Sequence, residues 1–331
     1  MIWKPAPVNA QQTHLRRRQA VSALALSALG LALPRGARAQ APEHIRLAGP
    51  LTEDLTALFY GIKSGLFGRA GVDVELIGTS SGTAAVTAVI AGTYEMAKTS
   101  LLSVFSAHLR SIPITIVAPE FVYSARSPFG LLQIASDATF KTGSDLNGKT
   151  IGVPALNDLN TLATRAWVDK NGGDWRSLKF VEVPNAVMEA ALQQHRIDAA
   201  MMQPPQLDAS LAAGTSKTLG DGYGAIAPGF LVGAFVARTD WVTPHADAVR
   251  RFARALAEAG AYVNAHAAET LPLVSELTKI PLAATEKMHR SFNATSLDVS
   301  TVQSLIDATA KYELLPRAFN AREIVWSEPR R

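Results

Sequence analysis

Apolar and polar positions alternate along much of the chain in the manner of an α/β protein. Short apolar runs of strand length, such as residues 44–50, 72–79 and 113–121, are separated by stretches whose apolar positions recur every three or four residues. Repeated strand–helix–strand units favour a mostly parallel sheet that helices cover on both faces. The pattern therefore predicts the α/β class.

The individual elements follow from the same periodicity and from the glycines that end several helices. Strands are predicted at residues 44–50, 72–79, 94–97, 113–121, 149–155, 178–184, 197–202 and 229–238. Helices are predicted from residue 54, from the turn at 79–83 to 91, and at 101–109, 158–170, 185–195, 245–266, 268–279, 284–292 and 299–312.

Two stretches of the chain resemble each other. Residues 72–97 and 178–202 each read as a strand, a short polar turn, an alanine-rich helix and a second strand with an acid at its second position, Glu95 or Asp198. This similarity predicts two α/β lobes with a cleft between them. We expect the first lobe to comprise residues 40–124 and the helical tail 227–331, and the second lobe residues 125–226. The chain would then cross twice, near 122–128 and near 224–230, and so form a hinge.

Residues 1–39 have the features of an export signal. Three arginines at 16–18 precede an apolar run of signal-peptide length, and a proline and two small residues, Ala37 and Ala39, follow it. We expect cleavage after Ala39 and location in the periplasm. An uncleaved membrane anchor is the alternative, although the run is short for a bilayer. The arginines suit either the twin-arginine or the general secretory route.

Charge and cysteine content exclude several classes of function. Six of the 32 basic residues and none of the 28 acidic residues lie before position 40, so the remaining chain has a net charge of −2. A nearly neutral body does not predict nucleic-acid binding. The sequence contains no cysteine, which excludes thiolate metal sites and cysteine nucleophiles. Hydrophobic residues make up 48% of the chain, as in globular proteins.

An ordered set of segments resembles a known family. The segments are GIKSGLFGRAGVDVEL, a helix closing in AGTYEMA, SDLNGKTIGVP, and VPNAVMEAALQQHRIDAAMMQPPQ. In this order they are similar to the periplasmic binding proteins for nitrate, taurine, alkanesulfonates and thiamine-pyrimidine precursors, the NMT1-like type II solute-binding proteins of ABC transporters. The resemblance covers nearly all of residues 44–325. It implies a two-lobed type II fold that closes on a small ligand and docks on a transporter permease in the inner membrane.

Candidate ligand-binding residues follow from the geometry of parallel sheets, where ligands bind beyond the carboxyl ends of strands. In the first lobe these positions hold Thr52, Glu53, Thr79, Ser80, Ser81, Gly82, Thr83, Lys98, Thr99 and Ser100. In the second lobe they hold Leu156, Asn157, Asp158, Asn160, Thr161, Asn185 and Gln203. Phe121 and Tyr123, near one crossing, are candidates for an aromatic wall.

Each of these candidates has an alternative role. The hydroxyl-rich turn at 79–83 suits an oxyanion, and the resemblance implies an anion-holding turn there, yet Ser and Thr also cap helices. Lys98 is a countercharge for such an anion or a surface lysine. Asn157 and Asp158 bind ligand or cap their helix. A carboxylate in the cleft opposes a strongly anionic ligand and favours one with an amine or ring N–H, so sulfonate, carboxylate and pyrimidine-type ligands all remain open.

Other motifs do not predict catalysis or metal binding. GSDLNGKT at 143–150 matches the phosphate-binding loop pattern, but a strand follows it where that loop requires a helix. The histidines have no zinc-site spacing. We therefore expect no cofactor, no metal and no catalytic residue. The leading hypothesis is a monomeric solute-binding protein of an ABC importer, and the alternatives are a ligand-sensing partner of a membrane receptor and an enzyme on the same scaffold.

Overall fold

The computed structural model describes residues 41–125, 129–286 and 288–327, and Pro42–Arg331 form one compact unit. The predicted signal segment and its cleavage site lie outside the described residues. Among the described residues, no helix combines the length and the apolar character needed to cross a membrane.

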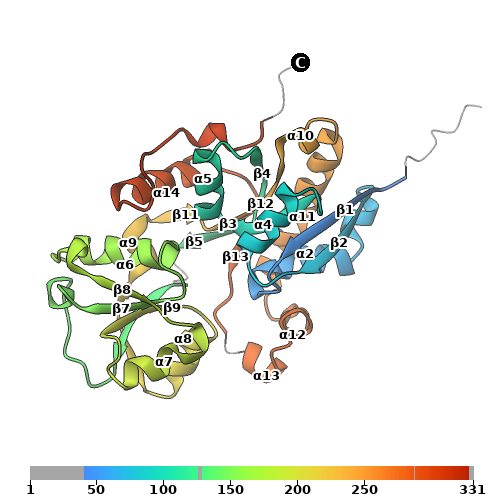
Figure 1. Cartoon of the computed structure of the whole chain (residues 1–331). Coiled ribbons are helices and arrows are strands. Elements are labelled where there is room, and N and C mark those ends of the chain that lie inside the picture. Colours follow the sequence, from blue (N-terminus) through green and yellow to red (C-terminus); the bar gives the residue numbers. More distant parts are fainter. Residues whose placement is uncertain (1–40, 126–128, 287, 328–331) are drawn as a thin grey trace, which may run out of the picture. The chain divides into compact units, whose positions relative to one another are not determined.

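The first sheet has five strands in the order β2-β1-β3-β12-β4 (Figure 1). The strands are β1 (Glu43–Gly49), β2 (Val72–Gly78), β3 (Met96–Ser100), β4 (Ile114–Pro119) and β12 (Gly233–Arg238). Strand β1 is parallel to β2 and β3, whereas β12 is antiparallel to both of its neighbours. Strand β4 is buried along its whole length, which explains its continuous apolar sequence.

Helices of this part of the chain pack against the sheet or against one another. They include η1 (Glu53–Leu55), α2 (Thr56–Lys63), α3 (Leu66–Arg69), α4 (Gly82–Ile90), α5 (Leu101–Leu109), α10 (Thr239–Val242), α11 (Ala246–Ala265), α12 (Leu271–Thr278) and α13 (Leu282–Thr285). Helix α11 buries the predicted face of Val249, Phe252, Leu256 and Val263. It packs on α2 and α3, where the rings of Phe67 and Phe252 stack with centroids 5.3 Å apart.

The second sheet has the order β10-β6-β9-β7-β8. Its strands are β6 (Leu131–Ala135), β7 (Thr150–Val153), β8 (Lys179–Glu182), β9 (Ala199–Met202) and β10 (Ser216–Asp221). Its helices are η2 (Ser144–Leu146), α6 (Leu159–Lys170), η3 (Trp175–Ser177), α7 (Asn185–Gln193), α8 (Gln206–Ala212) and α9 (Gly222–Ile226). Strands β7, β8 and β9 are parallel, and β6 is antiparallel to β9 and β10.

The two sheets share one plan, as the sequence similarity predicts. Each sheet contains one strand that is antiparallel to the others, β12 in the first sheet and β6 in the second. In both sheets this strand follows a crossing of the chain between the sheets. The matching acids also have matching roles. Glu95 accepts a hydrogen bond from the backbone N–H of Arg46 at 2.8 Å, and Asp198 accepts one from the N–H of Thr150 at 2.8 Å.

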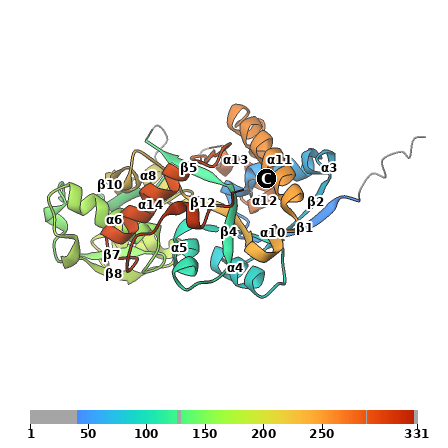
Figure 2. The ribbon, with the colours of Figure 1, turned by 90° about the horizontal axis from the view of Figure 1, so that it is seen from above.

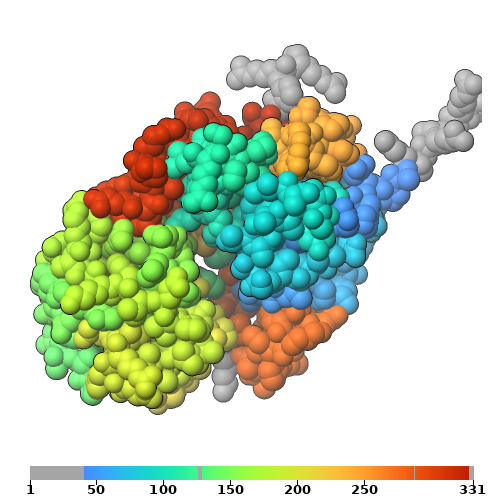
Figure 3. Space-filling model, in the orientation of Figure 1, coloured from blue at the N-terminus to red at the C-terminus, as the bar shows by residue number. Residues whose placement is uncertain are grey.

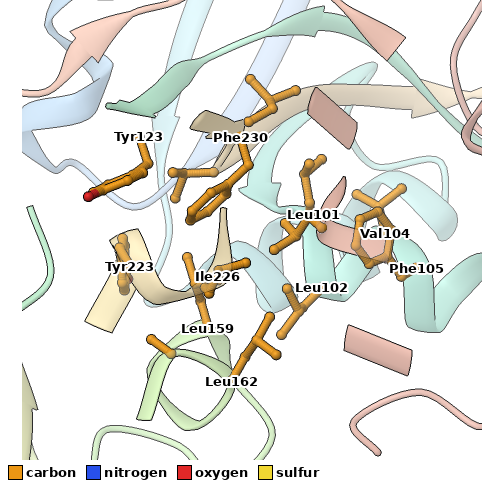
Figure 4. Packing of buried hydrophobic residues seen from close by; sticks show 14 of the residues in the cluster. Leu101, Leu102, Val104, Phe105, Tyr123, Leu159, Leu162, Tyr223, Ile226 and Phe230 are labelled. Atoms are coloured by element: carbon orange, nitrogen blue, oxygen red, sulfur yellow. The ribbon is translucent and has the colours of Figure 1, made fainter. Parts of the chain in front are cut away.

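A small third sheet lies where the chain passes between the two large ones. Strand β5 (Phe121–Ser124) pairs antiparallel with β11 (Gly229–Leu231) and with β13 (Phe292–Asn293). Tyr123 from β5 donates a hydrogen bond to Asp221 at the end of β10. Figure 4 shows Tyr123, Tyr223 and Phe230 close together in the apolar core beside this sheet. The two crossing segments are thus joined by backbone and side-chain contacts.

The last long helix, α14 (Val299–Lys311), contacts elements around both large sheets. It packs against β11, α5 and α6, and Figures 1 and 2 show it beside α5 and α6. Its end is tied to α6, since Lys311 Nζ donates to Asp169 at 2.9 Å and Arg165 donates to the carbonyl of Tyr312 at 2.6 Å. The short helix η4 (Ala321–Glu323) follows α14. After η4, Val325 forms a parallel bridge with Ile116 of β4.

Some predicted elements differ from the observed ones. The strands predicted at 113–121 and 229–238 each divide in two, because each begins in one sheet and ends in another. The helix predicted at 284–292 is wrong: α13 ends at Thr285. The backbone N–H groups of Ser291 and Asn293 instead donate to the side chains of Glu53 and Asn264, at 3.1 and 2.9 Å, which keeps this segment extended.

Candidate functional site

A cavity with a volume of about 600 Å³ lies between the two large sheets. Figure 3 shows the surface hollowed between the residues around the second sheet, green to yellow, and those around the first, teal to blue. The cavity is lined by residues at the carboxyl ends of β1, β3, β4, β7, β8 and β9 or directly after them. It thus lies beyond the carboxyl ends of the strands, where the sheet geometry predicts ligands to bind.

About half of the residues proposed from the sequence line this cavity. They are Thr52, Glu53, Lys98, Ser100, Phe121, Asp158, Asn160, Asn185 and Gln203. The others are not part of its lining. They are Thr79, Ser80, Ser81, Gly82, Thr83, Thr99, Tyr123, Leu156, Asn157 and Thr161.

The hydroxyl-rich turn at 79–83 makes local hydrogen bonds. Ser81 is the N-cap of α4, and its side chain accepts from the N–H of Ala84 at 3.1 Å. Thr79 donates to the carbonyl of Ser81 at 3.1 Å. These contacts fit the capping role. A contact between this turn and a ligand stays a prediction.

Lys98 is the centre of a buried charged cluster. It is only 7% exposed, so it is not a surface lysine. Its Nζ donates to Asp54 Oδ2 at 2.6 Å and forms an ion pair with Glu120 Oε1 at 3.2 Å. Burial by itself lowers the pKa of Lys98, but the two carboxylates outweigh it and raise that pKa above its ordinary value, so the side chain is charged.

Glu120 follows directly after β4 and is the most buried acid at the site. It is 3% exposed, and burial raises its pKa well above the ordinary range, with Asp54 adding to the rise and Lys98 opposing it. Its second oxygen, Oε2, packs against Gly233, where an added Cβ would lie 1.9 Å away. The absence of a side chain at position 233 therefore makes room for the carboxylate.

A second ion pair supports the same wall of the cavity. Arg290 Nε donates to Glu53 Oε1 at 2.6 Å, and the N–H of Ser291 donates to Glu53 Oε2 at 3.1 Å. Burial raises the pKa of Glu53, and Arg290 opposes that rise. This pair ties the segment after α13 to the loop that follows β1.

The opposite wall is a network of amides around Asp158. Asp158 is the N-cap of α6 and accepts from the N–H groups of Asn160 and Thr161 at 2.9 and 3.0 Å. The pKa of Asp158 is nevertheless raised by burial. Gln203 donates to Asn160 at 3.1 Å and also to the hydroxyl of Tyr223, which lies on α9 near the second crossing.

Aromatic side chains also line the cavity. The rings of Phe121 and Phe129 are tilted by 60° with centroids 5.4 Å apart, and both line the cavity with Tyr223. His289, another lining residue, contacts Asp208 of α8, with Nδ1 2.5 Å from Oδ1. That contact joins the segment after α13 to a helix beside the second sheet.

Several lining residues were not selected from the sequence. Glu120 lies within a predicted strand, Asp54 at a predicted helix start, and Tyr223, Gly233 and His289 come from late segments that meet the cavity only in three dimensions. One signal was available for Glu120: an acid directly after a wholly apolar strand stands at the carboxyl edge of the sheet.

Two α/β halves with a polar cavity between them are the architecture of periplasmic solute-binding proteins of the two-lobed type. The model of the NMT1/THI5-like family matches residues 52–270, about two thirds of the chain. The chain belongs to this family.

Solved structures with this fold include the periplasmic aliphatic sulphonate-binding protein SsuA of Escherichia coli. It has a TM-score of 0.72 and 14% identity, over 87% of this chain and 93% of that one. The periplasmic nitrate-binding protein NrtA of Synechocystis PCC 6803 has a TM-score of 0.68 and 15% identity, over 86% and 85%. These likenesses establish the fold.

Two further relatives are named for organic ligands. The alkanesulfonate-binding protein SsuA of Xanthomonas axonopodis pv. citri, bound to MOPS, has a TM-score of 0.68 and 17% identity, over 87% of this chain and 99% of that one. The formylaminopyrimidine-binding protein of Halalkalibacterium halodurans is 25% identical over 128 residues. That match covers 39% of this chain and 37% of the relative, so it spans well under half of either protein. All four relatives are named as binding proteins, and this family context supports a general solute-binding role.

Proposed function

We propose that the chain is the periplasmic solute-binding component of an ABC importer and catalyses no reaction. The observation that carries this proposal is the cavity of about 600 Å³ between two sheets, lined by polar side chains from both. Such a cavity has the size and mixed lining of small-molecule sites. The family membership and the periplasmic relatives support the same role.

In this proposal the two sheets are the cores of two lobes that move about the paired segments β5 and β11. Residues 40–124 with the tail form one lobe and residues 125–226 the other, and the ligand binds to both and stabilises the closed form. The ligand is a small organic molecule, and the closed protein docks on a transporter permease in the inner membrane. Residues 1–39 serve as the signal for export and are removed after Ala39.

Solution scattering on residues 40–331 tests the clamp. We expect the radius of gyration to fall when a ligand saturates the cavity, because closure brings the lobes together. Native mass spectrometry of protein purified from a periplasmic extract tests for a retained ligand, and the intact mass tests for Gln40 as the first residue. An empty protein whose radius does not respond to any solute that stabilises it would contradict the proposal.

A further inference from the structure

The segment 289–293 is anchored to the first lobe. Arg290 donates from Nε to Glu53 Oε1 at 2.6 Å and from Nη1 to the carbonyl of Ala267 at 3.1 Å. The N–H of Ser291 donates to Glu53 Oε2 at 3.1 Å. The side chains of Arg290 and Glu53 are only 16% and 10% exposed, so a mostly buried carboxylate holds the segment through both of its oxygens. Residues 290 and 291 should therefore move with the first lobe.

The residue directly before this anchor is held by the second lobe. Asp208 lies on α8, and its side chain accepts from two donors of His289, the backbone N–H at 3.1 Å and the ring Nδ1 at 2.5 Å. Each donor meets a different oxygen of the carboxylate, and such two-point contacts fix geometry as well as contribute energy. Neighbouring residues of one segment thus contact opposite lobes.

The contact between Asp208 and His289 lies beside the cavity. His289 lines the cavity, and so do Pro205 and Gln206, which come just before Asp208 in the sequence. The segment then continues into β13, which pairs with the crossing strand β5. Figures 1 and 2 both show α8 and α13 near each other. Residues 289–293 therefore connect the cavity wall, both lobes and the sheet about which the lobes move.

Opening of the lobes would break this contact. Because residues 290 and 291 are bound to Glu53, the segment cannot follow α8 when the second lobe moves away. The side chain of His289 is 45% exposed, so the contact contributes little to the stability of the whole fold. An equilibrium between two conformations of similar free energy responds even to one hydrogen bond. The chain supplies both partners, so the contact favours the closed form without a solute.

We propose that Asp208 and His289 form a latch that restrains opening of the lobes before a solute binds. Part of the solute-free population is then latched, and a solute enters through the unlatched part. The inference rests on the proposed function, since it concerns access to that binding site. Its consequence is a lower association rate, because binding that waits for a conformational change is slower than binding to a preformed opening.

A distance between two spin labels tests the latch in residues 40–331, dialysed until native mass spectrometry detects no bound solute. The sequence contains no cysteine, so Gln193→Cys on α7 and Glu258→Cys on α11 provide one exposed labelling site in each lobe. Double electron–electron resonance should give two distances in this parent, the shorter one from the latched form. Asp208→Asn replaces one acceptor oxygen by an amino group, so one donor of His289 loses its partner. The ratio of the longer to the shorter distance should rise roughly fivefold, the effect of about one net hydrogen bond.

Asp73→Asn is the matched control. Asp73 Oδ2 lies 2.8 Å from Nδ1 of His44, but the two residues are neighbours on β2 and β1 of one sheet, so the ratio should be unchanged. His289→Ala is the second latch variant and decides if Asp208→Asn fails to fold. The two latch variants combined should open the lobes no further than His289→Ala alone, because both remove the same contact.

A parent that shows only the longer distance would overturn the inference, and so would latch variants that leave the ratio unchanged. Either result concerns the latch alone. The retained ligand and the radius in solution judge the solute-binding role separately.

Discussion

Replacing Lys98 by methionine tests whether a buried ammonium holds the acidic wall together. Methionine has a similar length and no charge, so the substitution leaves the carboxylates of Asp54 and Glu120 without the cation at 2.6 and 3.2 Å. Removing one partner of a buried ion pair typically costs about 3 to 5 kcal/mol, because the remaining charge stays desolvated. In a unit of this size each kcal/mol lowers the melting temperature by roughly 2 °C. We therefore expect a loss of roughly 6 to 10 °C at pH 8.

The cost should fall at lower pH. Burial already raises the pKa of Glu120, and loss of Lys98 removes the charge that opposes this rise, so the carboxyl is neutralised as the pH falls and its burial costs less. Urea unfolding of residues 40–331 at pH 5, 6, 7 and 8 measures the trend. Lys63→Met is the control: Lys63 pairs with Glu276 at 2.6 Å, but both are about half exposed, and the pair contributes at most about 1 kcal/mol. A cost for Lys98→Met below 1 kcal/mol at pH 8, or one independent of pH, would refute the reasoning.

Four further predictions follow from the same contacts. Gly233→Ala should displace the Glu120 carboxylate and cost about 1 to 3 kcal/mol of stability in urea unfolding. Gly229→Ala, whose added Cβ meets only a backbone oxygen at 3.6 Å, should cost less than about 0.5 kcal/mol. A carboxyl whose pKa is higher in the folded than in the unfolded protein stabilises the fold below its unfolded pKa, and this contribution is lost as the pH rises through the folded pKa. Because burial raises the pKa of Glu120, the wild type should lose stability relative to Glu120→Gln between pH 5 and 8 in urea unfolding. A stability difference that stays constant over this range would contradict the prediction. Asp208→Asn weakens the contact with His289 and should enlarge the radius of the ligand-free protein in scattering; an unchanged radius would show that the contact does not restrain the lobes. Ser81→Ala should cost about 1 kcal/mol of stability in urea unfolding by loss of the α4 cap, and an unchanged stability would show that the cap does not contribute.

The sequence predicted elements best where apolar periodicity was strong. Helix α5 was expected at residues 101–109 and is found there, and α6, α11 and α14 differ from expectation by one or two residues. Strand β10 was missed because it is a polar edge strand with only Ser216 buried, so it carries no apolar alternation. Strand β6 was missed although its run LLQIA is largely buried, because it follows the crossing, pairs antiparallel with β9 and is not part of a strand–helix–strand unit.

The candidate site was predictable in position but not in chemistry. The rule that ligands bind beyond the carboxyl ends of strands placed Lys98, Asp158 and Gln203 at the cavity. The partners of Lys98 were not predictable in this way, because Asp54 is 44 residues away in the sequence and Glu120 lies at the end of a different strand. A lysine read alone indicates an anion site, whereas the same lysine between two carboxylates indicates the opposite.

Charge in the cavity decides between ligands where the fold does not. One fold supports many ligands, because the loops at the strand ends vary while the sheets persist. Two like charges 4 Å apart repel by about 4 kcal/mol at the effective dielectric of partly buried sites. An oxyanion beside Lys98 would meet this repulsion at the carboxylates of Asp54 and Glu120, which lie 2.6 and 3.2 Å from the same ammonium group. The preference of this cavity for a ligand's charge therefore depends on the two carboxylates as much as on the lysine, and the fold shared with sulfonate- and nitrate-binding proteins does not carry that information.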